Sequence, residues 1–281
     1  MNEARTTVVV ATRDRAAELV RTLAMLGTLR PRPPVIVVDN ASADDTGARV
    51  LREFPWVRLI RLPRNGGAAA RNIGVRAAET PYVAFSDDDS WWARDALPEA
   101  ELLFDVYPRL GLIAGRTLVG PGGEPDPVCE VMAASPLGKP ADVPGPLVLG
   151  FLACSAIVRR DAFLDTGGFS PLLHFAAEEK LLSYDLAARG WALCYVDRVR
   201  AHHHPSSTRP PPAWRQRLET RNNALIAWLR RPPGECVRAA APLLRDAGAA
   251  AGALRRLPRA LAGRDPLPHE VEAQVRELER R

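Results

Sequence analysis

Three consecutive aspartates, Asp87–Asp89, form the most conspicuous run of reactive side chains in the sequence. They follow the apolar run Tyr82–Ser86, whose Val, Tyr and Phe content is typical of a buried strand that ends at the acids. Adjacent carboxylates repel one another unless a positive charge lies among them, and a hard divalent cation shared with substrate phosphates is the usual partner. A polar loop in which Asp89 or Ser90 only caps the next helix is the alternative.

The first hundred residues alternate between two hydrophobic periods. Strand-like runs occur at Thr6–Ala11, Val35–Asp39, Val57–Leu62 and Tyr82–Ser86, and helical patterns occur between them at Arg15–Leu29, Asp45–Phe54 and Ala68–Ala78. Strand and helix alternating with short links predict an α/β fold with a doubly wound, mainly parallel sheet. Ligands of such sheets bind beyond the carboxyl ends of the strands.

Polar or glycine-rich residues follow each of these predicted strands, at Thr12-Arg13, Asp39-Asn40, Pro63–Gly67 and Asp87–Asp89. We expect all four to converge on one edge of the sheet. Asn65-Gly66-Gly67 precedes a predicted helix, so its backbone amides could face an anion that Arg71 also reaches. A hairpin-type turn at the glycines and an Asx turn after Asp39 are the alternatives.

The second half of the chain adds acids and histidines. Leu110–Val119 is predicted as a strand, and the Pro- and Gly-rich segment Gly120–Pro146 as a long irregular loop. Glu178 and Glu179 open a helix that ends at Gly190, where the helix dipole alone would favour acids. The predicted strand Trp191–Val196 is followed by His202, His203 and His204. Adjacent histidines cannot all turn to one metal, so at most one or two would bind it.

The composition changes after Pro205. From there to Arg281 the chain has fifteen arginines and eight acids, a net charge of +7 compared with +5 for all 281 residues. Helical patterns at Trp214–Arg230 and Cys236–Leu257, and a last charged helix, predict a basic helical extension over 206–281 behind a first domain over 1–205. The extension could dock on that domain, lie on a membrane surface or form a homodimer. It shows no aromatic interleaving, so no nucleic-acid partner is expected.

The location of the protein is predicted from cysteines and apolar runs. Four scattered cysteines without a CxxC motif fit a reducing cytoplasm. No segment looks like a signal peptide, and no uncharged apolar stretch reaches the roughly 18 residues of a transmembrane helix. A cytoplasmic protein is predicted, and contact of the extension with the inner face of the membrane is left open.

Five segments in order resemble the family 2 glycosyltransferases. They are VVVATRDRAAEL, VVDNASADDT, RNGGAAARNIG, FSDDDS, and GGFSPLLHFAAEEKLLSYDLAARGW followed by HHH, and they span roughly Thr7 to His204. The resemblance implies that residues 1–205 form a GT-A nucleotide-sugar-binding and catalytic domain of an inverting enzyme. The donor would be a nucleotide-diphosphate sugar.

The resemblance also assigns roles at the donor site. Thr12 and Arg13 would line the base and ribose, Asp39 would accept hydrogen bonds from the nucleoside, and Asn65 and Arg71 would lie near the nucleotide and diphosphate. The DxD element of the family corresponds to Asp87 and Asp89. Asp89 would bind Mg²⁺ or Mn²⁺, and Asp87 or Asp88 would hold the ribose or the donor sugar. The cation is needed because the leaving nucleoside diphosphate gains negative charge.

The catalytic base of the family lies in an acidic pair at the start of a helix, which here is Glu178-Glu179. This chain has Ala177 before the pair, where the family commonly has Gly, and Glu in the second place, where it has Asp. We assign the base to Glu179 and keep Glu178 as the alternative. One downstream histidine is a metal ligand in some members, and His204 or His202 would fill that role here.

The predicted function is a metal-dependent inverting hexosyl or deoxyhexosyl transferase. It would move a sugar from a nucleotide-diphosphate donor to a hydroxyl of a glycan, a lipid carrier or a small molecule. UDP, dTDP and GDP donors all occur among similar chains. A nucleotidyltransferase with a similar site is one alternative, but it would leave Glu178-Glu179 without a role. A non-catalytic nucleotide-binding module is the other.

Overall fold

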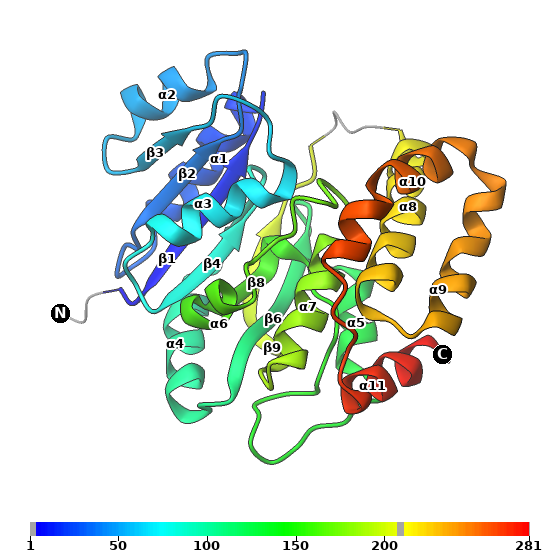
Figure 1. The fold of residues 1–281 in the computed structure, drawn as a ribbon. Coiled ribbons are helices and arrows are strands. Elements are labelled where there is room, and N and C mark those ends of the chain that lie inside the picture. The colour runs from blue at the N-terminus through cyan, green and yellow to red at the C-terminus, as the bar shows by residue number, and fades with distance from the viewer. Residues whose placement is uncertain (1–3, 207–210, 281) are drawn as a thin grey trace.

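The protein is built on a mixed β-sheet with helices on both faces (Figure 1). The computed structural model describes residues 4–206 and 211–280. Within these residues the sheet has nine strands, in the order β3-β2-β1-β4-β8-β6-β9-β5, with β7 paired to β6. The α/β class predicted from the sequence is confirmed, and the sheet stops being parallel where β8 pairs with β4.

The first half of the sheet is parallel, as predicted. It comprises β1 (Thr6–Thr12), β2 (Val35–Asp39), β3 (Arg58–Arg61) and β4 (Tyr82–Ser86). The crossovers contain α1 (Ala16–Leu26), α2 (Thr46–Glu53), and the short turn η1 (Gly67–Ala69) that leads into α3 (Ala70–Ala77). Alternate β1 residues enter different cores, Val8 on the α1 side and Val9 on the α3 side.

The second half of the sheet is mixed. It comprises β5 (Ser90–Trp92), β6 (Leu110–Val119), β8 (Ala156–Arg159) and β9 (Ala192–His203). Strand β8 is antiparallel to both β4 and β6, β9 is parallel to β6, and β5 is antiparallel to β9. The regular alternation of strand and helix ends at β4, because β5 follows it after only three residues.

Four helices complete this half. They are α4 (Ala96–Val106), α5 (Pro127–Ala133), α6 (Arg160–Asp165) and α7 (Glu178–Ala188), and the single turn η2 (Ala153–Ser155) precedes β8. The segment Gly120–Pro146 is more ordered than predicted, since it contains β7 (Glu124–Pro125) and α5. The Asp126 side chain accepts a hydrogen bond from Val128 N, and Pro127 occupies the first turn, so a short capped helix forms there.

The C-terminal helices are α8 (Pro212–Arg230), α9 (Pro233–Ala240), α10 (Ala247–Ala262) and α11 (His269–Glu279). The single helix predicted over Cys236–Leu257 is wrong, because η3 (Ala241–Arg245) interrupts it and Asp246 caps a new helix. No helix in the described part of the chain is long and apolar enough to cross a membrane.

Helices α8, α10 and α11 share a core with α7, which lies between them and the sheet (Figure 1). Leu181 and Tyr184 of α7 pack in one cluster with Leu225 of α8 and Val271 of α11. A buried ion pair joins Arg230 to Asp185 of α7, with 2.5 Å between Nε and Oδ1. The division into residues 1–205 and 206–281 stays a prediction, and residues 207–210 and 281 lie outside the described residues.

Candidate active site

The carboxyl ends of β1, β2 and β4 bring three of the predicted segments together. Thr12 of β1 is paired in register with Asp39 of β2. Its Oγ1 donates a hydrogen bond to Asp88 Oδ2 at 3.0 Å, so the first strand contacts the acidic triplet directly. Burial and the charges of Asp87 and Asp89 raise the pKa of Asp88 to about 7, and the bond from Thr12 opposes that rise. The site therefore lies at the sheet edge that the sequence predicts.

A potential cation site lies at the end of this edge. Asp87, Asp89 and His203 each offer one potential ligand atom, and these three atoms all lie within 4.8 Å of one another. His203 Nε2 is 3.3 Å from Asp89 Oδ1, and Ser206 N donates to Asp89 Oδ2 at 3.1 Å. Two carboxylates and an imidazole are a donor set that divalent metals accept in proteins.

The histidine side chain beside the aspartates is that of His203, whereas the sequence assigned the metal-ligand role to His204 or His202. The reason is that β9 continues through His203, so successive side chains point to opposite faces. His202 and His204 lie instead against the Trp91 ring, with centroids 5.8 Å and 4.6 Å away. His204 contributes only its backbone N–H, which donates to Asp89 O at 2.9 Å.

Arg71 connects the aspartates to the glutamate pair. Its Nη2 lies 2.5 Å from Asp87 Oδ1, and the side chain is only 12% exposed. Glu178 and Glu179 are its other charged neighbours, and all three acids raise its pKa against the effect of burial. The sequence placed Arg71 near the diphosphate; the structure places it between the two groups of acids.

Glu178 and Glu179 occupy the first turn of α7, as predicted. Glu178 is 4% exposed, and its Oε2 has no hydrogen-bond partner among the described residues, whereas Glu179 is half-buried. Burial raises the pKa of both carboxyl groups, and the neighbouring Glu178 helps to raise that of Glu179 to about 8. By surface exposure Glu179 is the more accessible of the two, and burial together with the neighbouring Glu178 favours the protonated form of its carboxyl group.

The loop before α7 has an unusual backbone. His174, Ala176 and Ala177 all have positive φ angles, of 66°, 72° and 59°. Side chains other than Gly rarely adopt this conformation, and it persists only where the surroundings impose it. The backbone that presents Glu178-Glu179 is therefore held by contacts from outside the loop.

Two elements supply those contacts. From α8, Asn222 Nδ2 lies within hydrogen-bond distance of the carbonyls of Leu173, Phe175 and Ala176, at 3.2, 2.8 and 2.6 Å. From the other side, Ala68 N donates to the His174 carbonyl at 2.7 Å. Gly67 makes this approach possible, because a Cβ there would lie 2.0 Å from the same oxygen.

The amides of the Asn65-Gly66-Gly67 turn do not face an anion, which corrects that expectation. Gly66 N donates to Asn40 Oδ1 and Gly67 N to Asn65 Oδ1, both at 2.8 Å. With Ala68 N bonded to His174, three successive amides are satisfied within the protein. The side chains of Asn40 and Asn65 thus accept hydrogen bonds from the backbone amides that the glycine-rich sequence predicted to be free for an anion.

The remaining predicted donor residues are engaged in local contacts. Asp39 is fully buried, where it accepts from Ser42 N at 2.8 Å and pairs with Arg61 Nε at 3.1 Å. Arg13 is half exposed and pairs with Asp14 at 3.3 Å. Contact of Thr12, Arg13, Asp39, Asn65 and Asp88 with a nucleotide stays a prediction.

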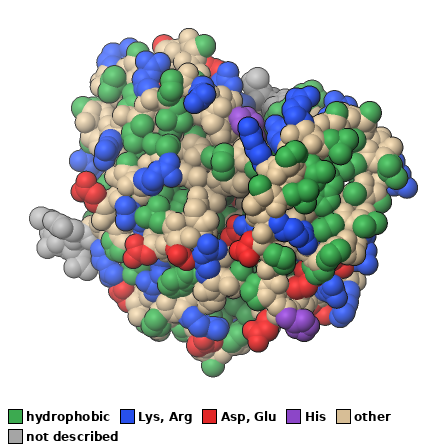
Figure 2. All heavy atoms as spheres, viewed as in Figure 1, with side chains coloured by type: hydrophobic (Ala, Val, Ile, Leu, Met, Phe, Trp, Pro, Cys, Tyr) green, Lys and Arg blue, Asp and Glu red, His purple; other side chains and the backbone are tan. Residues whose placement is uncertain are grey.

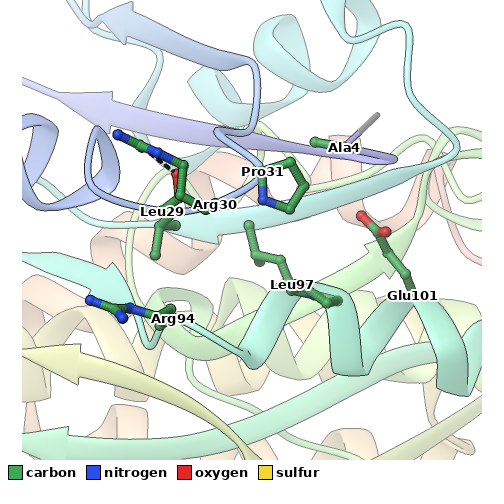
Figure 3. Close-up of a pocket in the computed structure, with 8 residues that line it drawn as sticks. Ala4, Leu29, Arg30, Pro31, Arg94, Leu97 and Glu101 are labelled. Carbon is green, nitrogen blue, oxygen red and sulfur yellow. Dashed lines mark hydrogen bonds between the residues drawn. The ribbon is translucent and has the colours of Figure 1, made fainter. Parts of the chain in front are cut away.

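A small depression elsewhere in the molecule carries no comparable chemistry. It lies beside Ala4 and Pro31, at the amino end of the parallel strands, with Leu97 and Glu101 of α4 on its other side (Figure 3). Glu101 already accepts hydrogen bonds from Arg5 N and Thr6 Oγ1. The candidate catalytic side chains therefore gather at the carboxyl edge and not here.

The profile of the family named Glycosyl transferase family 2 matches residues 7–167, more than half of the chain. The chain belongs to this family. The matched region contains the aspartate triplet and Arg71, while the glutamate pair and His203 lie beyond it.

Two relatives of this chain come from Mycobacterium tuberculosis. A pre-mycofactocin glycosyltransferase (strain H37Rv) is 33% identical over 216 residues, which are 72% of this chain and 43% of the relative. An N-acetylglucosaminyl-diphospho-decaprenol L-rhamnosyltransferase (strain H37Rv) is 27% identical over 241 residues, 73% of this chain and 78% of the relative. The chain thus spans less than half the length of the first relative.

Solved structures of glycosyltransferases share the GT-A fold of this chain. Residues 1–349 of S. aureus TarS in complex with UDP-GlcNAc superpose with a TM-score of 0.62 at 17% identity, covering 96% of this chain and 83% of that one. The mannosyltransferase PcManGT from Pyrobaculum calidifontis, in complex with GDP-Man and Mn²⁺, gives a TM-score of 0.61 at 22% identity, covering 98% and 79%. At these identities the likeness concerns the fold alone.

The raised pKa of Glu179 predicts a pH-dependent gain in stability for Glu179→Gln. Because the folded-state pKa of about 8 lies above the ordinary value of 4.5, ionisation costs the native protein stability as pH rises between those values. The Tm of Glu179→Gln minus that of the unsubstituted protein should be near zero at pH 4.5. It should grow by at least about 2 °C by pH 8.5.

Differential scanning fluorimetry across that pH range measures the difference. The substitution Glu277→Gln, in an exposed pair on α11, controls for the change of side chain itself. A difference that stays constant or shrinks as pH rises would contradict the assignment of a destabilising charge to Glu179.

Proposed function

We propose that this chain is a metal-dependent inverting glycosyltransferase that moves a sugar from a nucleotide-diphosphate donor to a hydroxyl acceptor. The observation that carries the proposal is the network around Arg71. This buried guanidinium pairs with Asp87 of the potential cation site and has Glu178 and Glu179 as its other acidic neighbours. One arginine therefore lies electrostatically between a site for the donor phosphates, through its ion pair with Asp87, and a pair of candidate bases.

Asp87, Asp89 and His203 would hold Mg²⁺ or Mn²⁺ in this proposal. Their carboxylate and imidazole atoms already lie within 4.8 Å of one another, which fits a single ion. The ion would neutralise charge on the departing nucleoside diphosphate. Asp89 is held by the backbone that follows β9, through Ser206 N and His204 N, so its carboxylate is positioned before any ligand arrives.

Glu179 would act as the general base. Its raised pKa makes the carboxylate a stronger proton acceptor, and its greater exposure favours it over the buried Glu178. Removing the acceptor hydroxyl proton lets the oxygen attack the anomeric carbon opposite the leaving diphosphate, which inverts that centre. A positioned base contributes about 10² to 10⁴ in rate.

The donor sugar and the acceptor are assigned only by class. TarS was solved with UDP-GlcNAc and PcManGT with GDP-Man, so uridine and guanosine donors are proposed alongside deoxythymidine ones. Thr12, Arg13, Asp39, Asn65 and Asp88 are proposed for the nucleoside side. The hexosyl or deoxyhexosyl group, a cytoplasmic location, and contact of the C-terminal helices with a membrane or a second copy remain predictions.

Asp89→Ala and Glu179→Gln should each lower sugar transfer by about 10² or more, because one removes a cation ligand and the other the base. A panel of UDP-, dTDP- and GDP-sugars with Mg²⁺ or Mn²⁺ measures release of nucleoside diphosphate. Proton NMR of the product reports its anomeric configuration, and circular dichroism confirms that both variants fold. Unchanged transfer in both variants, or release of pyrophosphate, would refute the proposal.

His203→Ala should weaken Mn²⁺ binding by at least about tenfold, the loss that even an outer partner of a metal ligand commonly causes. His204→Ala is the matched control, because its side chain lies on Trp91 and not on the aspartates. Electron paramagnetic resonance of free Mn²⁺ gives both affinities. Equal affinities in the two variants would remove His203 from the proposed site.

Asn222→Ala should lower kcat because it frees the strained loop that presents the base. A fall of roughly tenfold to a hundredfold is expected for a base displaced by about 1 Å. The exposed neighbour Asn223, which only accepts from Lys180 Nζ at 3.1 Å, gives the control Asn223→Ala. Kinetics with varied donor should show the loss in kcat and little change in the donor KM. Equal losses in both variants would show that Asn222 has no such positioning role.

A further inference from the structure

Three basic side chains gather where the loop before α7 meets the C-terminal helices. They are His174 of the loop, Arg221 of α8 and Arg256 of α10. Both arginines reach Gly252 of α10: a Cβ there would lie 2.9 Å from Arg221 Cδ and 4.0 Å from Arg256 Nη1. Arg221 Nη2 also donates to the carbonyl of Leu173, next to His174, at 2.8 Å.

Arg221 is exceptional among the buried arginines of the described chain. It is 8% exposed, yet no acid of residues 4–206 or 211–280 forms an ion pair with it. By contrast, Arg231 pairs with Glu272 at 2.7 Å, and the nearly buried Arg230 pairs with Asp185. The acceptors of Arg221 are the neutral oxygens of Leu173 and Asn222.

His174 and Arg256 also form no ion pair with an acid of residues 4–206 or 211–280. Within these residues, the only hydrogen bond that the Arg256 guanidinium donates goes to Gly252 O. The segment 207–210 has the sequence Ser-Thr-Arg-Pro and contains no acid. Burying a charge without a counter-charge is costly. The group therefore has the electrostatics of a site whose counter-charge comes from a ligand.

The mutual effects of the three side chains agree with this geometry. Burial and the charge of Arg256 lower the pKa of Arg221 to about 10. Burial and the charges of Arg221, Arg256 and Arg13 lower the pKa of His174.

The position of the group relates it to the acceptor side of the proposed site. Its members come from α8, α10 and the loop that leads to Glu178-Glu179, whereas the proposed cation site lies on β4 and β9. Helices α8 and α10 pack side by side at the edge of the molecule away from β1–β3 (Figure 1). Basic side chains lie at the upper end of the hollow between the strand half and these helices (Figure 2).

We propose that His174, Arg221 and Arg256 bind a phosphate or diphosphate group carried by the acceptor. Guanidinium groups match phosphate oxygens in two-point hydrogen bonds, and two of them beside an imidazole suit a doubly charged group better than a single carboxylate. Arg221 is fixed by its bonds to Leu173 and Asn222, so the site is preorganised. This inference rests on the proposed function only in assigning the anion to an acceptor.

Binding of inorganic pyrophosphate to the EDTA-treated full chain tests the site without the proposed metal. Arg256→Ala should weaken the affinity by about tenfold or more, the loss expected when one charge-assisted hydrogen bond is removed. Arg255→Ala is the matched control, because Arg255 is the exposed neighbour on the same helix. Isothermal titration calorimetry at low and high salt gives the affinities. Equal affinity in the two variants would overturn the proposal.

The source of the anion is tested with UDP and GDP in the presence of Mn²⁺. Their affinities should be the same for Arg256→Ala and Arg255→Ala. A loss in Arg256→Ala equal to that for pyrophosphate would assign the cluster to the donor phosphates and refute an acceptor site. If neither nucleotide binds the unsubstituted protein, the proposed function fails, while the pyrophosphate result still decides whether the anion site exists.

Two competitors of pyrophosphate then separate the classes of acceptor. Glucose 1-phosphate represents a soluble sugar phosphate, and dodecyl phosphate represents an amphiphilic one. Displacement of pyrophosphate by either supports a phosphate-bearing acceptor, and the tighter of the two indicates whether it is soluble or lipid-like. Failure of both to displace pyrophosphate would contradict the proposal.

Discussion

The structure depends on one buried cation among many acids. Asp87, Asp88, Asp89, Glu178 and Glu179 come from two elements far apart in the sequence, and their charges oppose close approach. Arg71 lies between them, pairs with Asp87 at 2.5 Å and is nearly enclosed. A guanidinium with several donors in one plane can serve acids on more than one side. The start of α3 therefore has to face both the end of β4 and the start of α7, which fixes how the two halves of the sheet meet.

Much of this fold could be predicted because its central strands are continuous apolar runs. The bounds of β2, β4 and β6 agree with the sequence patterns, since each strand is largely buried. Strand β9 differs, because its second half contains Asp197, Arg198 and Arg200 and pairs with β6 across an irregular register. Apolar periodicity ends at Val196 there, so the strand was predicted too short. Because the sequence pattern did not show that β9 extends to His203, it could not predict which face of the sheet each of the three histidines points to.

The polar contacts of the site were less predictable than its acids. The glycine pattern suggested free amides, but two asparagines, Asn40 and Asn65, already occupy them. Asn222 gave no signal at all, because its partners are backbone carbonyls almost fifty residues earlier in the chain. Sequence patterns report which side chains are apolar or charged. They do not report which distant backbone group a buried amide will meet, which depends on how α8 packs on α7.

The contacts of Asn222 and Arg221 with the loop before α7 have a consequence for how the protein is made. A nascent chain that has left the ribosome only as far as α7 contains every acidic residue of the site. It lacks Asn222 and Arg221, whose side chains bind backbone carbonyls between Leu173 and Ala176, in the loop where His174, Ala176 and Ala177 have positive φ angles. Domains usually fold in the order in which they are synthesised. Here the Glu178-Glu179 pair can take its final place only after a later helix has docked, so assembly of the candidate site is coupled to the completion of translation through α8.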